Sequence, residues 1–165
     1  MKNYKLHILI IGLILSKIMV IPGFVNFLLS IVTKAELQYN YWWIVSAIGL
    51  ILSVAGLILL LLIIFKKRQP ARTMSSQSRS AYLRQIFFSF VNIGMSLGVG
   101  LFSTIVALYA LNNAIDATNV SNGTLTESLL RKANLLNIVA IILIGIQWLT
   151  LAIFVGSIHQ AGLNL

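Results

Sequence analysis

The stretch from Tyr41 to Phe65 reads YWWIVSAIGLILSVAGLILLLLIIF and contains no charged residue. As an α-helix rising about 1.5 Å per residue, it is long enough to cross a hydrocarbon layer about 30 Å thick. Aromatic residues stand at its beginning and three basic residues follow its end, which is typical of the two interfaces of a membrane span. This stretch predicts a transmembrane helix over residues 41–65.

Three other apolar runs have comparable length and predict spans at about 6–32, 85–111 and 133–158. The chain is 59% hydrophobic and only 9% charged, against roughly 25% charged residues in soluble domains. Because hydrocarbon offers no partner for backbone polar groups, helices that satisfy their own hydrogen bonds are favoured. The predicted fold is an all-α, polytopic membrane protein, a single domain over 1–165 with four transmembrane helices in an antiparallel bundle.

Basic residues are concentrated between the second and third predicted spans. The chain has twelve basic and three acidic residues, and half of the basic ones lie in the segment 66–84: Lys66, Lys67, Arg68, Arg72, Arg79 and Arg84. By the positive-inside rule this loop faces the cytoplasm, which places both termini there and the loop 112–132 outside. We expect these six cations to contact anionic lipid rather than nucleic acid, in the plasma membrane or an endomembrane.

Two further features bear on processing. Lys2 and Lys5 precede the first apolar run, as in a secretory signal, but no small-residue cleavage site follows. Asn119 and Asn122 each begin an N-glycosylation sequon in the predicted outer loop. We therefore expect an uncleaved first span and candidate glycosylation at the two asparagines.

Small residues mark where helices approach one another in a membrane. In the third predicted span Ser96, Gly100 and Ser103 belong to one such face, and Gly94 and Gly98 form a GxxxG pair beside it. The second span has a similar face formed by Ser46, Gly49, Ser53 and Gly56. Two interpretations stay open: packing within one four-helix bundle, or an edge reserved for a partner helix.

Lys17 is the most informative single residue, because it lies eleven residues after Leu6 and so about 16 Å deep. A charge at that depth is costly and usually faces a bundle interior or a cavity. The three carboxylates all fall in predicted loops: Glu36, Asp116 and Glu127. Lys17 therefore either snorkels or joins a polar cluster with Asn92 and Gln147, receives an anionic lipid or a carboxylate of another chain, or serves transport.

The sequence offers few residues for disulfide, metal-binding or catalytic chemistry. The absence of cysteine excludes disulfides and thiolate metal sites. His7 and His159, without a nearby carboxylate, are too few to predict a metal site. The sequence has no nucleophile with an adjacent base and no phosphate-binding glycine loop. We predict no enzymatic activity, no cofactor and no bound metal.

The segments PGFVNFLLS (22–30), GLILSVAGLILLL (49–61) and VNIGMSLGVGL (91–101), separated by short loops, give the chain a recognisable layout. In this layout it resembles the four-span family of keratinocyte-associated protein 3 and transmembrane protein 54. The resemblance covers the spans only. It implies a four-span protein of unassigned activity, with no catalytic residue.

These observations predict a non-enzymatic membrane protein that acts by lateral association, as an assembly, trafficking or scaffold component. Small-residue faces supply contact surfaces for another membrane protein or a second copy, and Lys17 supplies a polar contact. The alternative is a small transporter or channel-like oligomer, in which Lys17, Asn92 and Gln147 line a polar path.

Overall fold

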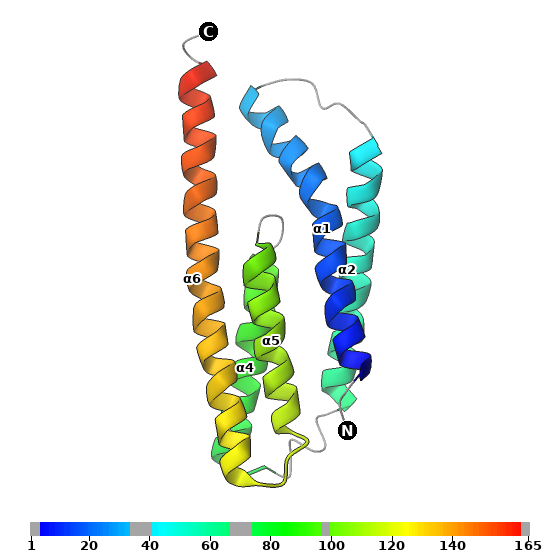
Figure 1. Cartoon of the computed structure of the whole chain (residues 1–165), viewed down its shortest axis with the longest axis vertical. Helices are drawn as coiled ribbons and strands as arrows, with labels where there is room; N and C mark the ends of the chain where they lie inside the picture. Colours follow the sequence, from blue (N-terminus) through cyan, green and yellow to red (C-terminus); the bar gives the residue numbers. More distant parts are fainter. Residues whose placement is uncertain (1–3, 34–40, 67–73, 97–99, 163–165) are drawn as a thin grey trace.

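The computed structural model describes residues 4–33, 41–66, 74–96 and 100–162. These residues form five helices (Figure 1): α1 (Tyr4–Thr33), α2 (Tyr41–Lys66), α4 (Ser76–Met95), α5 (Leu101–Ala117) and α6 (Gly123–Gly162). Three stretches are long and apolar enough to cross a membrane: Leu6–Leu28, Tyr41–Lys66 and Gly123–Ser157. The described part of the chain is thus all-helical, as predicted, and has the helices of a membrane protein.

The prediction of one continuous span over 85–111 is wrong. Helix α4 ends at Met95, and α5 begins at Leu101 and returns beside α4 as a helical hairpin (Figure 1). The apolar parts of the two helices, 85–95 and 101–111, are each about 16 Å long, which is about half of the hydrocarbon thickness. Glycines in the run between them favour the break, since each lowers helix stability by about 1 kcal/mol relative to alanine.

The hairpin changes the topology, because it returns the chain to the end from which it came. The start of α1, the end of α2, the start of α4, the end of α5 and the start of α6 all lie at one end of the molecule, here called the basic end (Figure 1). Helix α6 finishes at the opposite end. This arrangement differs from the predicted one, in which both termini share one side and 112–132 lies across the bundle from 66–84: α1 begins at the basic end, α6 finishes away from it, and the described parts of both loops lie at the basic end.

Both predicted loops are also shorter than expected. Helix α4 begins at Ser76, within the expected loop 66–84, and its N-cap Ser75 accepts a hydrogen bond from the Ser78 backbone N–H at 3.2 Å. Helix α5 continues to Ala117 and α6 begins at Gly123, so that the connection spans 118–122 rather than 112–132. N-capping and charged helix ends extend these helices beyond the apolar runs that hydropathy detects.

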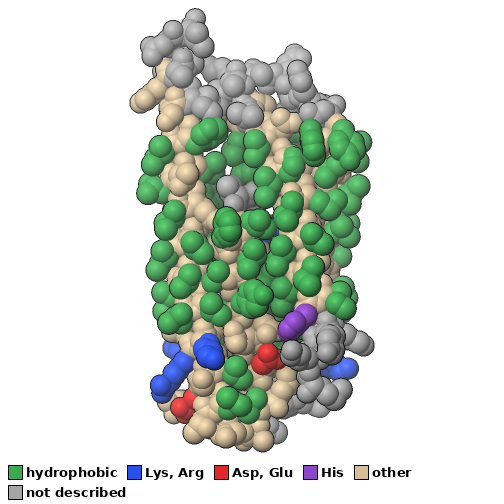
Figure 2. Space-filling view, viewed as in Figure 1, with side chains coloured by type: hydrophobic (Ala, Val, Ile, Leu, Met, Phe, Trp, Pro, Cys, Tyr) green, Lys and Arg blue, Asp and Glu red, His purple; other side chains and the backbone are tan. Residues whose placement is uncertain are grey.

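The core surrounds α5, in the half of the bundle near the basic end. Its buried members come from all five helices and include Leu13, Leu60, Ile93, Leu108 and Ala140. Beyond the hairpin, no residue of α6 from Gly145 to Ser157 is buried. Figure 2 shows a hollow between the hydrophobic side chains at this level of the bundle. We call this part of α1, α2 and α6 (residues 18–33, 41–52 and 146–162) the open half.

Helices α1 and α2 meet through the small-residue face predicted on the second span, all four members of which are buried. A Cβ atom built on Gly49 would lie 2.7 Å from the Met19 Cβ and 2.7 Å from the Ser16 carbonyl oxygen, so only glycine fits. The hydroxyls of Ser16 and Ser53 form a hydrogen bond of 2.8 Å across the same contact. The predicted contact face is confirmed, and α1 is its partner.

Pro22 lies inside α1 and lacks the N–H that would continue the helical hydrogen bonds. Ser46 of α2 bonds to the backbone beside it: the Gly23 N–H donates to the Ser46 Oγ at 2.8 Å, and that hydroxyl donates to the Met19 carbonyl at 3.0 Å. Beyond this point α1 diverges from α2 (Figure 1). One serine therefore stabilises the backbone next to the proline and joins the two helices.

The α1–α2 contact predicts the effect of added volume. Gly49→Ala forces two backbones apart and should lower the free energy of unfolding by about 1–3 kcal/mol. Gly145→Ala is the matched control, because nothing lies within 4 Å of its Cβ position, and it should be neutral or slightly stabilising. Unfolding in mixed detergent micelles, followed by circular dichroism, measures both; equal effects would contradict the contact.

The topology predicts which positions share a side of the membrane. The chain has no cysteine, so single substitutions Ser75→Cys, Ser121→Cys and Gln160→Cys can each be labelled with a membrane-impermeant maleimide. Ser75→Cys and Ser121→Cys should react from the same side and Gln160→Cys from the opposite one. A four-span topology gives a different result, with Ser75→Cys and Gln160→Cys on one side and Ser121→Cys on the other.

Candidate functional site at the hairpin end

The polar side chains of the interior gather where the hairpin turns. The C-cap of α4 is Ser96, whose N–H donates to the Asn92 carbonyl at 3.0 Å, and Gly100 is the N-cap of α5. A Cβ atom on Gly100 would meet the Ser103 hydroxyl and lie 2.6 Å from the Ser96 Cβ and 2.9 Å from the Gln147 Oε1. Glycine is therefore required here by close approach of three side chains.

Lys17 reaches this turn from α1. Its side chain is 6% exposed, and its Nζ donates to the Ser96 Oγ at 3.4 Å. The Ser96 hydroxyl is in turn shared with the Thr104 Oγ1 at 2.6 Å and with the Ile93 carbonyl at 2.8 Å. Within the described residues this is the only hydrogen-bond partner of the ammonium, and no carboxylate lies within ion-pair distance. The charge is buried with one long, neutral contact.

Helix α6 contacts the hairpin end through two neighbouring residues. Gln147 accepts a hydrogen bond from the Ser103 hydroxyl at 2.9 Å, and the Trp148 indole N–H donates to the Met95 carbonyl at 3.3 Å. Carbonyls in the last turn of a helix have no partner within it. Trp148 thus binds a carbonyl of the last turn of α4, and α6 contacts the end of the hairpin.

Below the turn, α4 and α6 are joined by a cluster of amides centred on Asn137. Its Oδ1 accepts from the Ser89 hydroxyl at 3.1 Å and the Asn92 Nδ2 at 3.2 Å, while its Nδ2 donates to the Gln85 Oε1 at 3.0 Å. The Gln85 Nε2 donates to the Asn134 Oδ1 at 3.0 Å. These direct bonds connect a ladder of polar groups from the basic end to the hairpin end.

The other predicted site residues lie outside these clusters. Gly94 is exposed, and no atom of the described residues lies within 4 Å of its Cβ position, so none of them packs against this edge. The cations Lys66, Arg79 and Arg84 are exposed at the basic end, and Asn119 and Asn122 are also exposed there. Gly98 and three predicted lipid contacts, Lys67, Arg68 and Arg72, lie outside the described residues.

The predicted intramembrane polar residues are brought near one turn but do not bond to one another. Lys17, Asn92 and Gln147 each contact a different residue. Sequence reasoning missed Asn137, the centre of the amide cluster, and read the polar side of α4 as a small-residue face. Its signal was present: Gln85, Ser89 and Asn92 recur at helical spacing opposite the pair Asn134 and Asn137.

No group of three or more histidine, aspartate or glutamate side chains placed to hold a metal occurs among the described residues. Comparison with family models, with curated proteins and with solved structures found no match for this chain.

The amide cluster predicts a stability effect. Asn137→Leu keeps the branching of the side chain but leaves the Ser89 hydroxyl and the Gln85 Oε1 without this partner, while Asn92 keeps its bond to the Asn137 backbone carbonyl. It should lower the free energy of unfolding by about 1–3 kcal/mol. The control Asn113→Leu loses only a bond to the Tyr109 carbonyl of its own helix. It should change the free energy of unfolding by less than about 0.5 kcal/mol. Mixed-micelle unfolding compares them; a neutral Asn137→Leu would contradict a structural role.

Proposed function

We propose that this protein is a non-enzymatic integral membrane protein with α1, α2 and α6 crossing the bilayer and the α4–α5 hairpin entering it from the basic end. The positive-inside rule orients this end to the cytoplasm, because cations exceed carboxylates there. The described charges at this end are Lys66, Arg79, Arg84, Arg131 and Lys132 against Asp116 and Glu127. Asn119 and Asn122 then face the cytoplasm, so neither sequon is glycosylated, and the carboxyl terminus lies across the membrane.

The function supported best is lateral association with another membrane protein, as an assembly, trafficking or scaffold component. The observation that carries it is Lys17, a buried ammonium whose one hydrogen bond among the described residues, to the Ser96 hydroxyl, is 3.4 Å long. A cation in hydrocarbon costs several kcal/mol unless it is paired, and such residues mark binding sites. Charge complementarity specifies the partner: a transmembrane segment with a carboxylate near mid-depth.

The partner is another protein rather than a second copy of this chain. Asp116 and Glu127 lie at the basic end, away from the hairpin end, and Glu36 lies between two spans in the sequence. The open half supplies the surface for such a segment, since α6 exposes large apolar side chains from Ile146 to Phe154 and the hairpin does not extend between the helices there. The carboxylate reaches Lys17 at the base of this space.

A defined peptide tests the proposal. A leucine-rich transmembrane peptide with one central glutamate, labelled for energy transfer, should associate with the protein in phosphatidylcholine vesicles. Lys17→Met should weaken this association by about tenfold or more, because a charge pair in a water-poor site is lost. The control Lys66→Met removes an exposed interfacial lysine and should have little effect.

Two results would oppose lateral association through Lys17. One is equal binding of a peptide whose central glutamate is replaced by glutamine, since the carboxylate would then be irrelevant. The other is equal binding to the wild-type protein and to Lys17→Met. Because Lys17→Met removes a buried charge rather than exposing one, circular dichroism should show that it retains its helical content.

A second candidate function is a small transporter or channel-like oligomer. It is favoured by the polar ladder between α4 and α6, which runs from Gln85 and Asn134 at the basic end towards Lys17, Asn92 and Gln147. It ranks second because these groups bond directly to protein partners. It requires Lys17→Met to abolish chloride flux in reconstituted vesicles; unchanged flux, or no flux in the wild type, would exclude chloride transport.

A further inference from the structure

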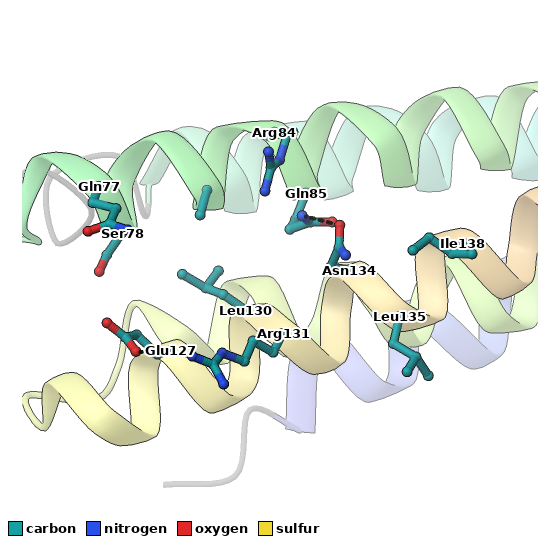
Figure 3. Close-up of a pocket in the computed structure, with 11 residues that line it drawn as sticks. Gln77, Ser78, Arg84, Gln85, Glu127, Leu130, Arg131, Asn134, Leu135 and Ile138 are labelled. Atoms are coloured by element: carbon teal, nitrogen blue, oxygen red, sulfur yellow. Dashed lines mark hydrogen bonds and ion pairs between the residues drawn. The ribbon is translucent and has the colours of Figure 1, made fainter.

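A groove of about 360 Å³ lies between α4 and α6 at the basic end, beside the charged residues rather than at the hairpin end. Arg84 lines it from α4 and Arg131 from α6 (Figure 3). Gln77 and Ser78 lie at its outer end, and Asn134 and Gln85 form a hydrogen-bonded pair further in. The groove thus has a guanidinium on each wall, one carboxylate, Glu127, near its outer end, and uncharged hydrogen-bonding groups between the two walls.

The positive charge of the groove is poorly neutralised by the protein. Among the described residues Arg84 has no carboxylate within ion-pair distance. Arg131 has one contact, to Glu127 at 3.9 Å, and both side chains are largely exposed, so the pair contributes little. Guanidinium groups bind phosphate with two parallel hydrogen bonds, and two of them from neighbouring helices favour an anionic phosphate ester.

The inner end of the groove is apolar. Leu130 is buried beneath it, while Leu135 and Ile138 on α6 are 63% and 51% exposed and continue towards the membrane interior. The polarity of the groove therefore changes along its length, from cationic at the interface to apolar below it. A phospholipid has the same order of chemistry, from headgroup phosphate to acyl chain.

We propose that this groove binds one anionic phospholipid, with its phosphate between Arg84 and Arg131 and the first part of an acyl chain along Leu135 and Ile138. This is more specific than attraction of the whole basic segment to an anionic surface. It adds residues of α6, which the sequence did not associate with lipid, and it requires the α4–α6 contact. It is independent of lateral association through Lys17.

Native mass spectrometry of the full chain in neutral detergent tests the proposal with phosphatidylglycerol as the probe. One phosphatidylglycerol should remain bound to the wild type, and phosphatidylcholine should bind less. Arg84→Gln combined with Arg131→Gln should raise the dissociation constant about twenty-five-fold, if each cation contributes about fivefold. The control Arg79→Gln with Lys132→Gln removes the same charge from the same helices, outside this groove, and should raise it less than about threefold.

Each remaining outcome would overturn the proposal. Equal weakening by the two double variants would indicate general surface attraction, and equal retention of phosphatidylcholine would show that the anionic charge is not recognised. Displacement of the lipid by millimolar glycerol phosphate would assign the groove to a soluble phosphate ester instead. Circular dichroism should show unchanged helical content in both variants, since the substituted side chains are exposed.

Discussion

The rest of the structure depends on how the backbone is satisfied where the α4–α5 hairpin turns within the apolar part of the bundle. A helix that stops in hydrocarbon leaves carbonyls and N–H groups without partners or water. Here the Ser96 hydroxyl donates to the Ile93 carbonyl, the Thr104 hydroxyl donates to the Gly100 carbonyl, and the Trp148 indole donates to the Met95 carbonyl. The turn is therefore stabilised by its own hydroxyls and by a side chain from α6.

This turn determines the shape of the bundle. Because the hairpin fills only the half near the basic end, that half has a closed core around α5, whereas the opposite half is formed by α1, α2 and α6 alone. Lys17 lies at the boundary between the two halves, through its bond to Ser96. The same feature that leaves the open half without a central helix thus places an incompletely paired cation at its base.

The contact between α4 and α6 has a different character at each level. At the hairpin end the Trp148 indole donates to the Met95 carbonyl, and in the middle the amide cluster around Asn137 joins the two helices. At the basic end the groove between Arg84 and Arg131 separates them. Direct amide bonds across helices are individually modest, on the order of 0.6 kcal/mol. Several of them on one asparagine hold the two helices at the spacing that forms the groove.

Several residues of the candidate site could be identified from the sequence, but their partners could not. Lys17, Asn92 and Gln147 were identified as buried polar groups, because polar side chains stand out in apolar runs. Their partners were not identified, since Ser96, Asn137 and Ser103 lie 79, 45 and 44 residues away in the chain. Sequence spacing carries no information about which of many hydroxyls and amides meet across helices.

The sequence by itself determined that the chain is helical and apolar enough for a membrane, because hydropathy and the rise per residue are local quantities. It did not determine whether the run 85–111 crosses or turns back. The seven-residue spacing of Ser89, Ser96, Ser103 and Ala110 suits one face of a single helix, yet it also suits two helices that face a common interior. Only the tertiary structure decided between them, since the end of α4 is bound by the Trp148 indole, which α6 supplies from a distant part of the chain.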